Sequence, residues 1–148
     1  MSNLNAQIKA DIKDAMRAKD VQKRNTLRNI QVAVKDIEVN ERREVTDADV
    51  EAILMKYAKQ REDAMAQFKE AGRNDLVEQE EAELAIVKTY LPEPMSDEEL
   101  ESTLKEIIAS TGAESMKDMG KIMGAAKKAI SSRADGGRIN VCVKALLN

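Results

Sequence analysis

The sequence lacks histidine and tryptophan and has only one cysteine and three aromatic residues. Histidine is the commonest general base at neutral pH, so the usual catalytic base is missing. With no imidazole and one thiol, a zinc site of the Cys/His type is excluded, and we expect neither a metal nor a cofactor. The shortage of aromatic residues disfavours a β-sandwich or barrel. What remains is a composition without a self-contained catalytic centre.

Long apolar runs are also missing. No segment approaches the roughly 18 consecutive apolar residues of a membrane helix, and the first residues lack the pattern of a secretory signal. The single cysteine, Cys142, cannot form an intrachain disulfide and fits a reducing compartment. The sequence therefore predicts a water-soluble, cytoplasmic protein that does not contact membranes.

Helix-forming residues dominate what is present: hydrophobic residues make up 43% and charged residues 34% of the chain. Apolar residues recur at helical spacing, and we expect an all-α fold. Asp20 and Thr46 predict the N-caps of a second and a third helix, and Asn74 that of a fourth. The heptad-like spacing of the last two stripes predicts a helical hairpin packed lengthwise. Residues 1–92 form this predicted N-terminal helical bundle.

The prolines of Leu91-Pro92-Glu93-Pro94 mark the predicted domain boundary, because neither can continue a helix. Ser96 and Glu99 form a complete capping box that predicts the start of a helix. Ser115 is expected to cap the next helix, and Asp135-Gly136-Gly137 to form the turn before the last one. Residues 95–148 are thus predicted to form a small three-helix domain.

Charges are distributed unevenly around the overall value of −3. Residues 1–43 hold ten Lys or Arg against six Asp or Glu, and residues 112–148 hold seven against three, whereas the middle is acidic. The acids Glu78, Glu80, Glu81 and Glu83 are interpreted as a solvated helix face. Arg61 interrupts an apolar stripe and is interpreted as a partly buried ion-pair residue.

Between Met116 and Ile130 a helical wheel separates a lysine face from a Met/Ile stripe. Two glycines four residues apart fall on or beside the lysine face, where each costs about 1 kcal/mol relative to alanine. Missing side chains would let the backbone approach RNA phosphates while cations neutralise them. The predicted RNA-binding residues are Lys117, Gly120, Lys121, Gly124, Lys127, Lys128, Arg133, Gly136 and Arg138, with Lys144 as an extension.

Other interpretations stay open. The glycines could instead let a neighbouring helix pack closely, with the lysines as ordinary solvated surface. Lys23, Arg24 and Arg28 form a further basic cluster that fits a solvated face as well as a binding site. Methionines 55, 65, 116, 119 and 123 are assigned to the core, and Cys142 to a small apolar role rather than a nucleophile.

Several strings in the right order resemble the YqeY family, whose C-terminal domain is shared with the tail of the GatB subunit of tRNA-dependent amidotransferases. They include residues 117–124 (KDMGKIMG), 132–140 (SRADGGRIN), 71–76 (AGRNDL) and 80–84 (EEAEL). The resemblance covers essentially the whole chain. It implies an N-terminal helical domain and a three-helix tail that holds tRNA, while kinase and amidase chemistry reside in domains that these strings do not include.

The sequence thus favours a tRNA-binding accessory protein that is not itself an enzyme. The resemblance implies an aminoacyl-tRNA synthetase or an amidotransferase complex as further partners. An alternative is a protein-interaction module that docks on a translation complex without touching RNA. A third reading, glutamine-dependent amidotransferase activity, has no catalytic constellation in this sequence to support it.

Overall fold

The helices begin where short polar side chains can accept the free backbone amides of a first turn. In the computed structural model, which describes residues 2–147, the Asp20 carboxylate accepts from the Lys23 amide at 3.1 Å. Thr46 and Asp49 form a reciprocal capping box, and the Ser96 hydroxyl accepts from the Glu99 amide. The described residues form the α-helices α1 (Asn3–Arg17), α2 (Val21–Glu41), α3 (Asp47–Glu70), α4 (Asn74–Lys88), α5 (Asp97–Thr111), α6 (Met119–Ile130) and α7 (Gly136–Leu147).

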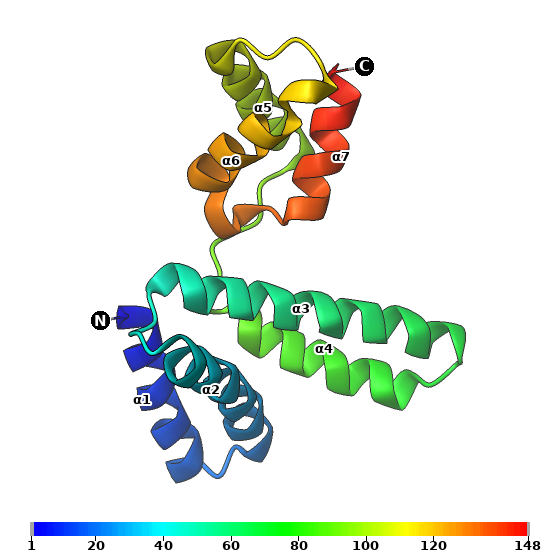
Figure 1. Cartoon of the computed structure of the whole chain (residues 1–148). Coiled ribbons are helices and arrows are strands. Elements are labelled where there is room, and N and C mark those ends of the chain that lie inside the picture. The colour runs from blue at the N-terminus through cyan, green and yellow to red at the C-terminus, as the bar shows by residue number, and fades with distance from the viewer. Residues whose placement is uncertain (1, 148) are drawn as a thin grey trace. The chain divides into compact units, whose positions relative to one another are not determined.

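The predicted all-α fold is confirmed, since residues 2–147 contain helices and connections but no strand (Figure 1). The chain divides into two compact units between Leu91 and Pro92. That these units behave as independent domains, with the limits 1–92 and 95–148, stays a prediction. Among the helices described, none combines the length and apolar character required to cross a bilayer.

In the first unit α1 packs beside α2, and α3 packs lengthwise against α4 (Figure 1). The pair α3–α4 is the hairpin that the sequence predicts. Its core contains fully buried side chains from each of these helices, including Ile8, Leu27, Ile30, Leu54 and Val87. The Tyr90 hydroxyl, just beyond α4, donates to the Asp11 carboxylate of α1. Burial, followed by the contact with Asp11, raises the pKa of this phenol.

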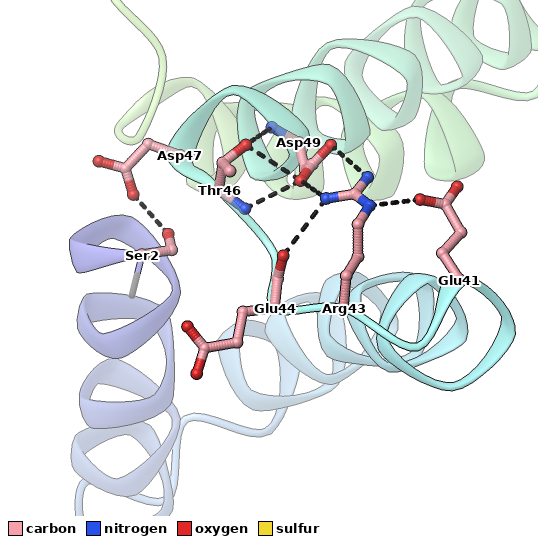
Figure 2. Close-up of polar contacts among 7 residues, drawn as sticks. All are labelled: Ser2, Glu41, Arg43, Glu44, Thr46, Asp47 and Asp49. Atoms are coloured by element: carbon pink, nitrogen blue, oxygen red, sulfur yellow. Dashed lines mark hydrogen bonds and ion pairs between the residues drawn. The ribbon is translucent and has the colours of Figure 1, made fainter.

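Polar contacts tie the start of α1, the end of α2 and the start of α3 together (Figure 2). The Arg43 guanidinium bridges Glu41 and Asp49, with Nη1 lying 2.6 Å from the Asp49 carboxylate. The Ser2 hydroxyl donates to the Asp47 carboxylate. Hydrogen bonds from Arg43 and the Thr46 amide hold the pKa of Asp49 well below its usual range. The carboxylates of Glu41, Asp47 and Asp49 therefore stabilise the contact between these three helix ends.

The second unit is a three-helix arrangement of α5, α6 and α7 (Figure 1). Leu104, Ile122, Ala126 and Val143 are fully buried at its centre. Gly112 ends α5 with a φ of +69°, a left-handed conformation that glycine adopts without steric cost. Its position matches the predicted stop.

Two predicted helix starts are wrong. Asn74 is the first residue of α4 rather than its cap, because Arg73 occupies the cap position and makes no side-chain capping bond. Ser115 caps a single 3-10 turn, Met116–Asp118, and α6 begins only at Met119. Met116 is consequently 41% exposed, not in the core as predicted. Met119 and Met123 pack against the core as expected.

Candidate nucleic-acid interface

Helix α6 separates two faces along its whole length. Ile122, Ala126 and Ile130 are buried on one side. Gly120, Lys121, Gly124, Lys127 and Lys128 are all exposed. This division follows from the helical period of 3.6, which returns every third or fourth residue to the same side. The amphipathic pattern predicted from the sequence is present.

The glycines of α6 face open space. A Cβ built at Gly120 or Gly124 would have no neighbouring heavy atom within 4 Å. Neither glycine therefore serves close packing against another described helix of the second unit. Their helical conformation is also one that alanine would adopt with higher propensity. The alternative that these glycines let the last helix of the same unit pack closely is contradicted.

Lysines surround this bare stretch of backbone. Lys121 and Lys128 lie on α6 itself, and Lys117 lies in the preceding 3-10 turn, where its amide donates to the Ser115 hydroxyl at 3.3 Å. Within residues 2–147 the ammonium groups of Lys117, Lys121, Lys127 and Lys128 form no ion pair. We call this surface, Lys117, Gly120, Lys121, Gly124, Lys127 and Lys128, the α6 lysine face.

The two predicted arginines have partners inside the second unit. The Arg133 guanidinium donates to both oxygens of Glu99 at 3.0 and 3.1 Å and to the Glu93 carbonyl. Arg138 donates to the Met95 carbonyl and to the Asp97 carboxylate, each at 2.9 Å. The two side chains thereby connect the first turn of α5 and the segment before it to the first turn of α7 and the segment before that helix. Their contribution to RNA binding stays a prediction.

This arrangement corrects the expected capping box of α5. Ser96 caps the helix as predicted, but the Glu99 carboxylate binds Arg133. The bidentate pair gives the carboxylate two hydrogen bonds from a cation, whereas the contact that completes a capping box gives it one from an uncharged amide. The sequence could not reveal this choice, because Arg133 lies 34 residues further along the chain.

Gly136 and Gly137, predicted to form a turn before the last helix, are instead the first two residues of α7. Asp135 accepts from the Arg138 amide at 2.7 Å and so caps the helix. A Cβ at Gly137 would lie 3.1 Å from that carboxylate, whereas one at Gly136 would meet nothing within 4 Å. Gly137 therefore allows the cap to form, and Gly136 remains an exposed part of the predicted surface.

A second charged cluster lies between α3 and α4, and the sequence revealed only half of it. Arg61 lies 4.7 Å from the centre of the Tyr57 ring and 3.4 Å from the carboxylates of both Glu80 and Glu83. The prediction of Arg61 as a partly buried ion-pair residue is confirmed. The interpretation of the acidic run as a solvated face is wrong for Glu80 and Glu83, which expose 14% and 17% of their side chains.

Desolvation is the main cause that raises the pKa of Glu80, partly offset by Arg61. Arg61 pairs with two carboxylates, so this cluster holds the hairpin together. Burial likewise raises the pKa of the half-buried Cys142 thiol, the opposite of what a nucleophilic thiolate requires. Among the described residues no group of three or more Cys, Asp or Glu side chains could hold a metal ion.

Comparison with known proteins gives one family. The family model described as Yqey-like protein matches residues 5–147. Proteins named "Altered inheritance of mitochondria protein 41, mitochondrial" are similar to the chain. The relative from Pyrenophora tritici-repentis is 29% identical over 129 residues, covering 86% of this chain and 71% of the relative. The relative from Lachancea thermotolerans is 31% identical over 120 residues, covering 76% of this chain and 64% of the relative. The relative from Saccharomyces cerevisiae is 33% identical over 106 residues, covering 68% of this chain and 56% of the relative.

These relatives contradict the predicted cytoplasmic location, since their names are those of mitochondrial proteins. The physical reason for the error is that the argument rested on a lone cysteine and the absence of a secretory signal. Both features fit any reducing compartment and do not distinguish one from another. The chain spans less than two thirds of the second and third of these relatives.

Proposed function

Because the chain belongs to the Yqey-like protein family, we propose that it is an accessory protein that binds tRNA through the α6 lysine face. A synthetase or an amidotransferase complex would be the partner to which it presents the RNA. Catalysis is not part of this proposal.

One observation carries the proposal: exposed backbone without side chains lies among lysines that no acid of the described chain neutralises. Phosphates dominate the affinity of nucleic-acid complexes and require cations and close approach. Each glycine in α6 lowers helix stability, by about 1 kcal/mol in a helix interior. This surface therefore combines glycines that lower helix stability with lysines that have no acid partner. Both features favour the close approach of a polyanion.

The recognition would rely on shape and backbone. All three aromatic residues, Tyr57, Phe68 and Tyr90, lie in the first unit, so residues 92–148 offer no ring on which a base could stack. Folded RNA is recognised chiefly by its shape and by phosphate and 2′-hydroxyl contacts, whereas single strands need stacking platforms. The α6 lysine face therefore suits a folded RNA such as tRNA.

The test is filter binding of the full chain to total tRNA between 50 and 200 mM salt, conditions under which phosphate contacts lose affinity by orders of magnitude. Changing Lys117, Lys121 and Lys128 together to Glu is expected to abolish the binding. The matched control changes Lys56, Lys59 and Lys88 to Glu, three exposed lysines of the first unit. Equal binding by the α6 variant and the wild type would refute this site.

A second candidate function is docking on a protein without RNA contact. It is favoured by Val141 of α7, which is 71% exposed. A pull-down that survives nuclease treatment and the Lys117/Lys121/Lys128→Glu change, but not Val141→Asp, would support this alternative.

A further inference from the structure

The α1–α2 hairpin uses its acids within the fold but leaves most of its cations unpaired. Residues 1–43, which comprise this hairpin and the start of the loop after it, hold ten Lys and Arg residues, and the described chain supplies an ion pair for Arg17 and Arg43 among them. The acids of the hairpin, by contrast, are largely engaged: Asp11 accepts from Tyr90, and Asp20 caps α2. Asp14 and Glu41 bind the two paired arginines. Eight of the ten cations are therefore without an ion-pair partner in the described chain, and they are available to give this surface a positive potential.

Part of this charge is aligned along one edge of α2. Arg24, Arg28, Gln31 and Lys35 recur at intervals of four, three and four residues, which places them within about 60° of one another over about 16 Å of helix. Arg28 is exposed and lies 3.7 Å from the Met16 sulfur of α1, and Gln31 donates to Asn5 of α1 at 2.8 Å. These contacts show that this edge of α2 faces α1.

Lys9 adds a cation from the other side. A groove of about 340 Å³ between the two helices is lined by Lys9, Gln31, Val34, Lys35 and Glu38. Lys9 and Lys35 are exposed, and neither ammonium group has an acid partner within the described residues. Lys9 and Lys35 line this groove, and Arg24 and Arg28 continue the line of cations along α2 beyond it. We call the set Lys9, Arg24, Arg28 and Lys35 the basic groove.

We propose that the basic groove is a second RNA-binding surface, separate from the α6 lysine face, that takes the phosphate backbone of a folded RNA. Glu38 lines the same groove and would repel a compact anion held between Lys9 and Lys35. A phosphate chain can instead follow the cations along the edge of α2 and pass the carboxylate at a distance. The repeated spacing of the cations suits a polyanion rather than a single phosphate.

An acidic protein is the competing occupant. Protein partners are held mainly by burial of apolar side chains at the centre of an interface. The line from Arg24 to Lys35 carries Gln31 between its cations, and Val34 in the groove is only 2% exposed and has little surface left to bury. Arg28 and Lys35, the exposed members of this line, are cations that pair with phosphate groups, whereas the exposed Val32 and Val39 of α2 lie beside the line rather than in it.

This inference rests on the proposed function for the identity of the RNA, but it concerns other residues and has its own test. The variant Lys9→Gln/Arg28→Gln/Lys35→Gln removes three charges from the basic groove. Its matched control, Lys56→Gln/Lys59→Gln/Lys88→Gln, removes three charges from α3 and α4 of the same unit. Both full-length variants are titrated with total tRNA, and with poly-L-glutamate as the acidic-protein probe, at several salt concentrations.

We expect the groove variant to bind tRNA about ten- to a hundred-fold more weakly, with a slope of log K against log salt smaller by about 2 to 3, since each phosphate contact contributes about 0.7 to 0.9. The control should keep the wild-type slope. A second variant, Lys9→Gln/Lys35→Gln, leaves Arg28 beside Met16 and should lower the slope by about 1 to 2. Melting temperatures matching the wild type show that the variants are folded.

The outcomes separate the two proposals. An unchanged slope for both groove variants, with binding lost in the Lys117/Lys121/Lys128→Glu variant, overturns the basic groove and leaves the proposed function intact. The reverse pattern supports the basic groove and refutes the α6 lysine face. Groove-dependent binding of poly-L-glutamate without that of tRNA overturns the RNA assignment. Failure of the wild type to bind tRNA at low salt overturns both.

Discussion

The α3–α4 hairpin and helix α6 treat charged side chains in opposite ways. In the hairpin, Arg61 is held by two glutamates and a tyrosine ring and exposes only 26% of its side chain. On α6 the lysines extend from an exposed face and form no ion pair with an acid of the described chain. Charges that stabilise a fold are desolvated and paired, whereas charges available to a partner remain solvated and unpaired. The comparison therefore separates charged residues that stabilise the fold from charged residues that are available to bind a partner.

The largest expected effect tests the paired side of this comparison. Arg61→Ala should lower the free energy of unfolding of the first unit by about 2 to 3 kcal/mol, because two partly buried carboxylates lose their cation. Urea denaturation at pH 7 measures this loss. Glu80→Gln is the control, since it keeps the Arg61–Glu83 pair and should leave stability nearly unchanged.

The pH dependence gives this prediction a sign. A carboxyl whose folded-state pKa is raised, as that of Glu80 is, contributes stability that is complete below its unfolded value near 4.5 and is lost as pH rises through the folded value. Removing Arg61 removes the cause that lowers the pKa of Glu80, so the deficit should shrink as pH falls from 7 towards 5. An equal deficit at both values would show that Arg61 acts through packing alone.

The next prediction tests the α6 lysine face, whose charges are available to a partner. Gly124→Ala should stabilise the second unit by about 1 kcal/mol, and Gly120→Ala by less, because Gly120 lies in the first turn of α6. The added methyl groups meet no protein atom, so no steric cost opposes the gain. Thermal unfolding should show a raised melting temperature while tRNA affinity falls, since the methyl groups hold the RNA backbone away. A stabilised double variant with unchanged affinity would contradict the role given to the glycines.

The smallest effect concerns arginines that lie between these extremes. Arg133 and Glu99 expose 40% and 46% of their side chains, so their bidentate pair is worth about 1 kcal/mol at most. Arg133→Gln should therefore lower the stability of the second unit by that amount, as followed by urea denaturation. If the variant instead keeps its stability and loses tRNA affinity, Arg133 is a binding residue rather than a structural one.

Local features were predictable because each depends on a few neighbouring residues. The caps at Asp20, Thr46 and Ser96, the stop at Gly112 and the two faces of α6 all follow from short-range spacing. The predicted cap at Asn74 failed by one residue. The 3-10 turn at Met116–Asp118 was missed because a helical wheel assumes one uniform rotation.

Long-range pairing was not predictable. Glu80 and Glu83 belong to an acidic run that looks solvated, and only the packing of α4 on α3 brings them to Arg61. The partners of Arg133 and Arg138 lie 34 and 41 residues away, so nothing local distinguished these arginines from the free lysines. The tertiary structure determines which cations have no acid partner, and the candidate binding surface consists of those cations.

The arginine contacts of the second unit also bear on how it is made. Arg133 and Arg138 reach back to Glu99, Asp97 and Met95, so the first helix of this unit acquires its fastenings from residues near its end. During synthesis, domains generally fold as units from the N-terminus. If the two units fold independently as predicted, the first can complete its core once Leu91 has left the ribosome. Helix α5 must then wait for Arg133 and Arg138, which lie 34 and 41 residues after their partners Glu99 and Asp97. A nascent chain stalled before Arg133 would therefore display a finished first unit followed by an unfastened, acidic α5.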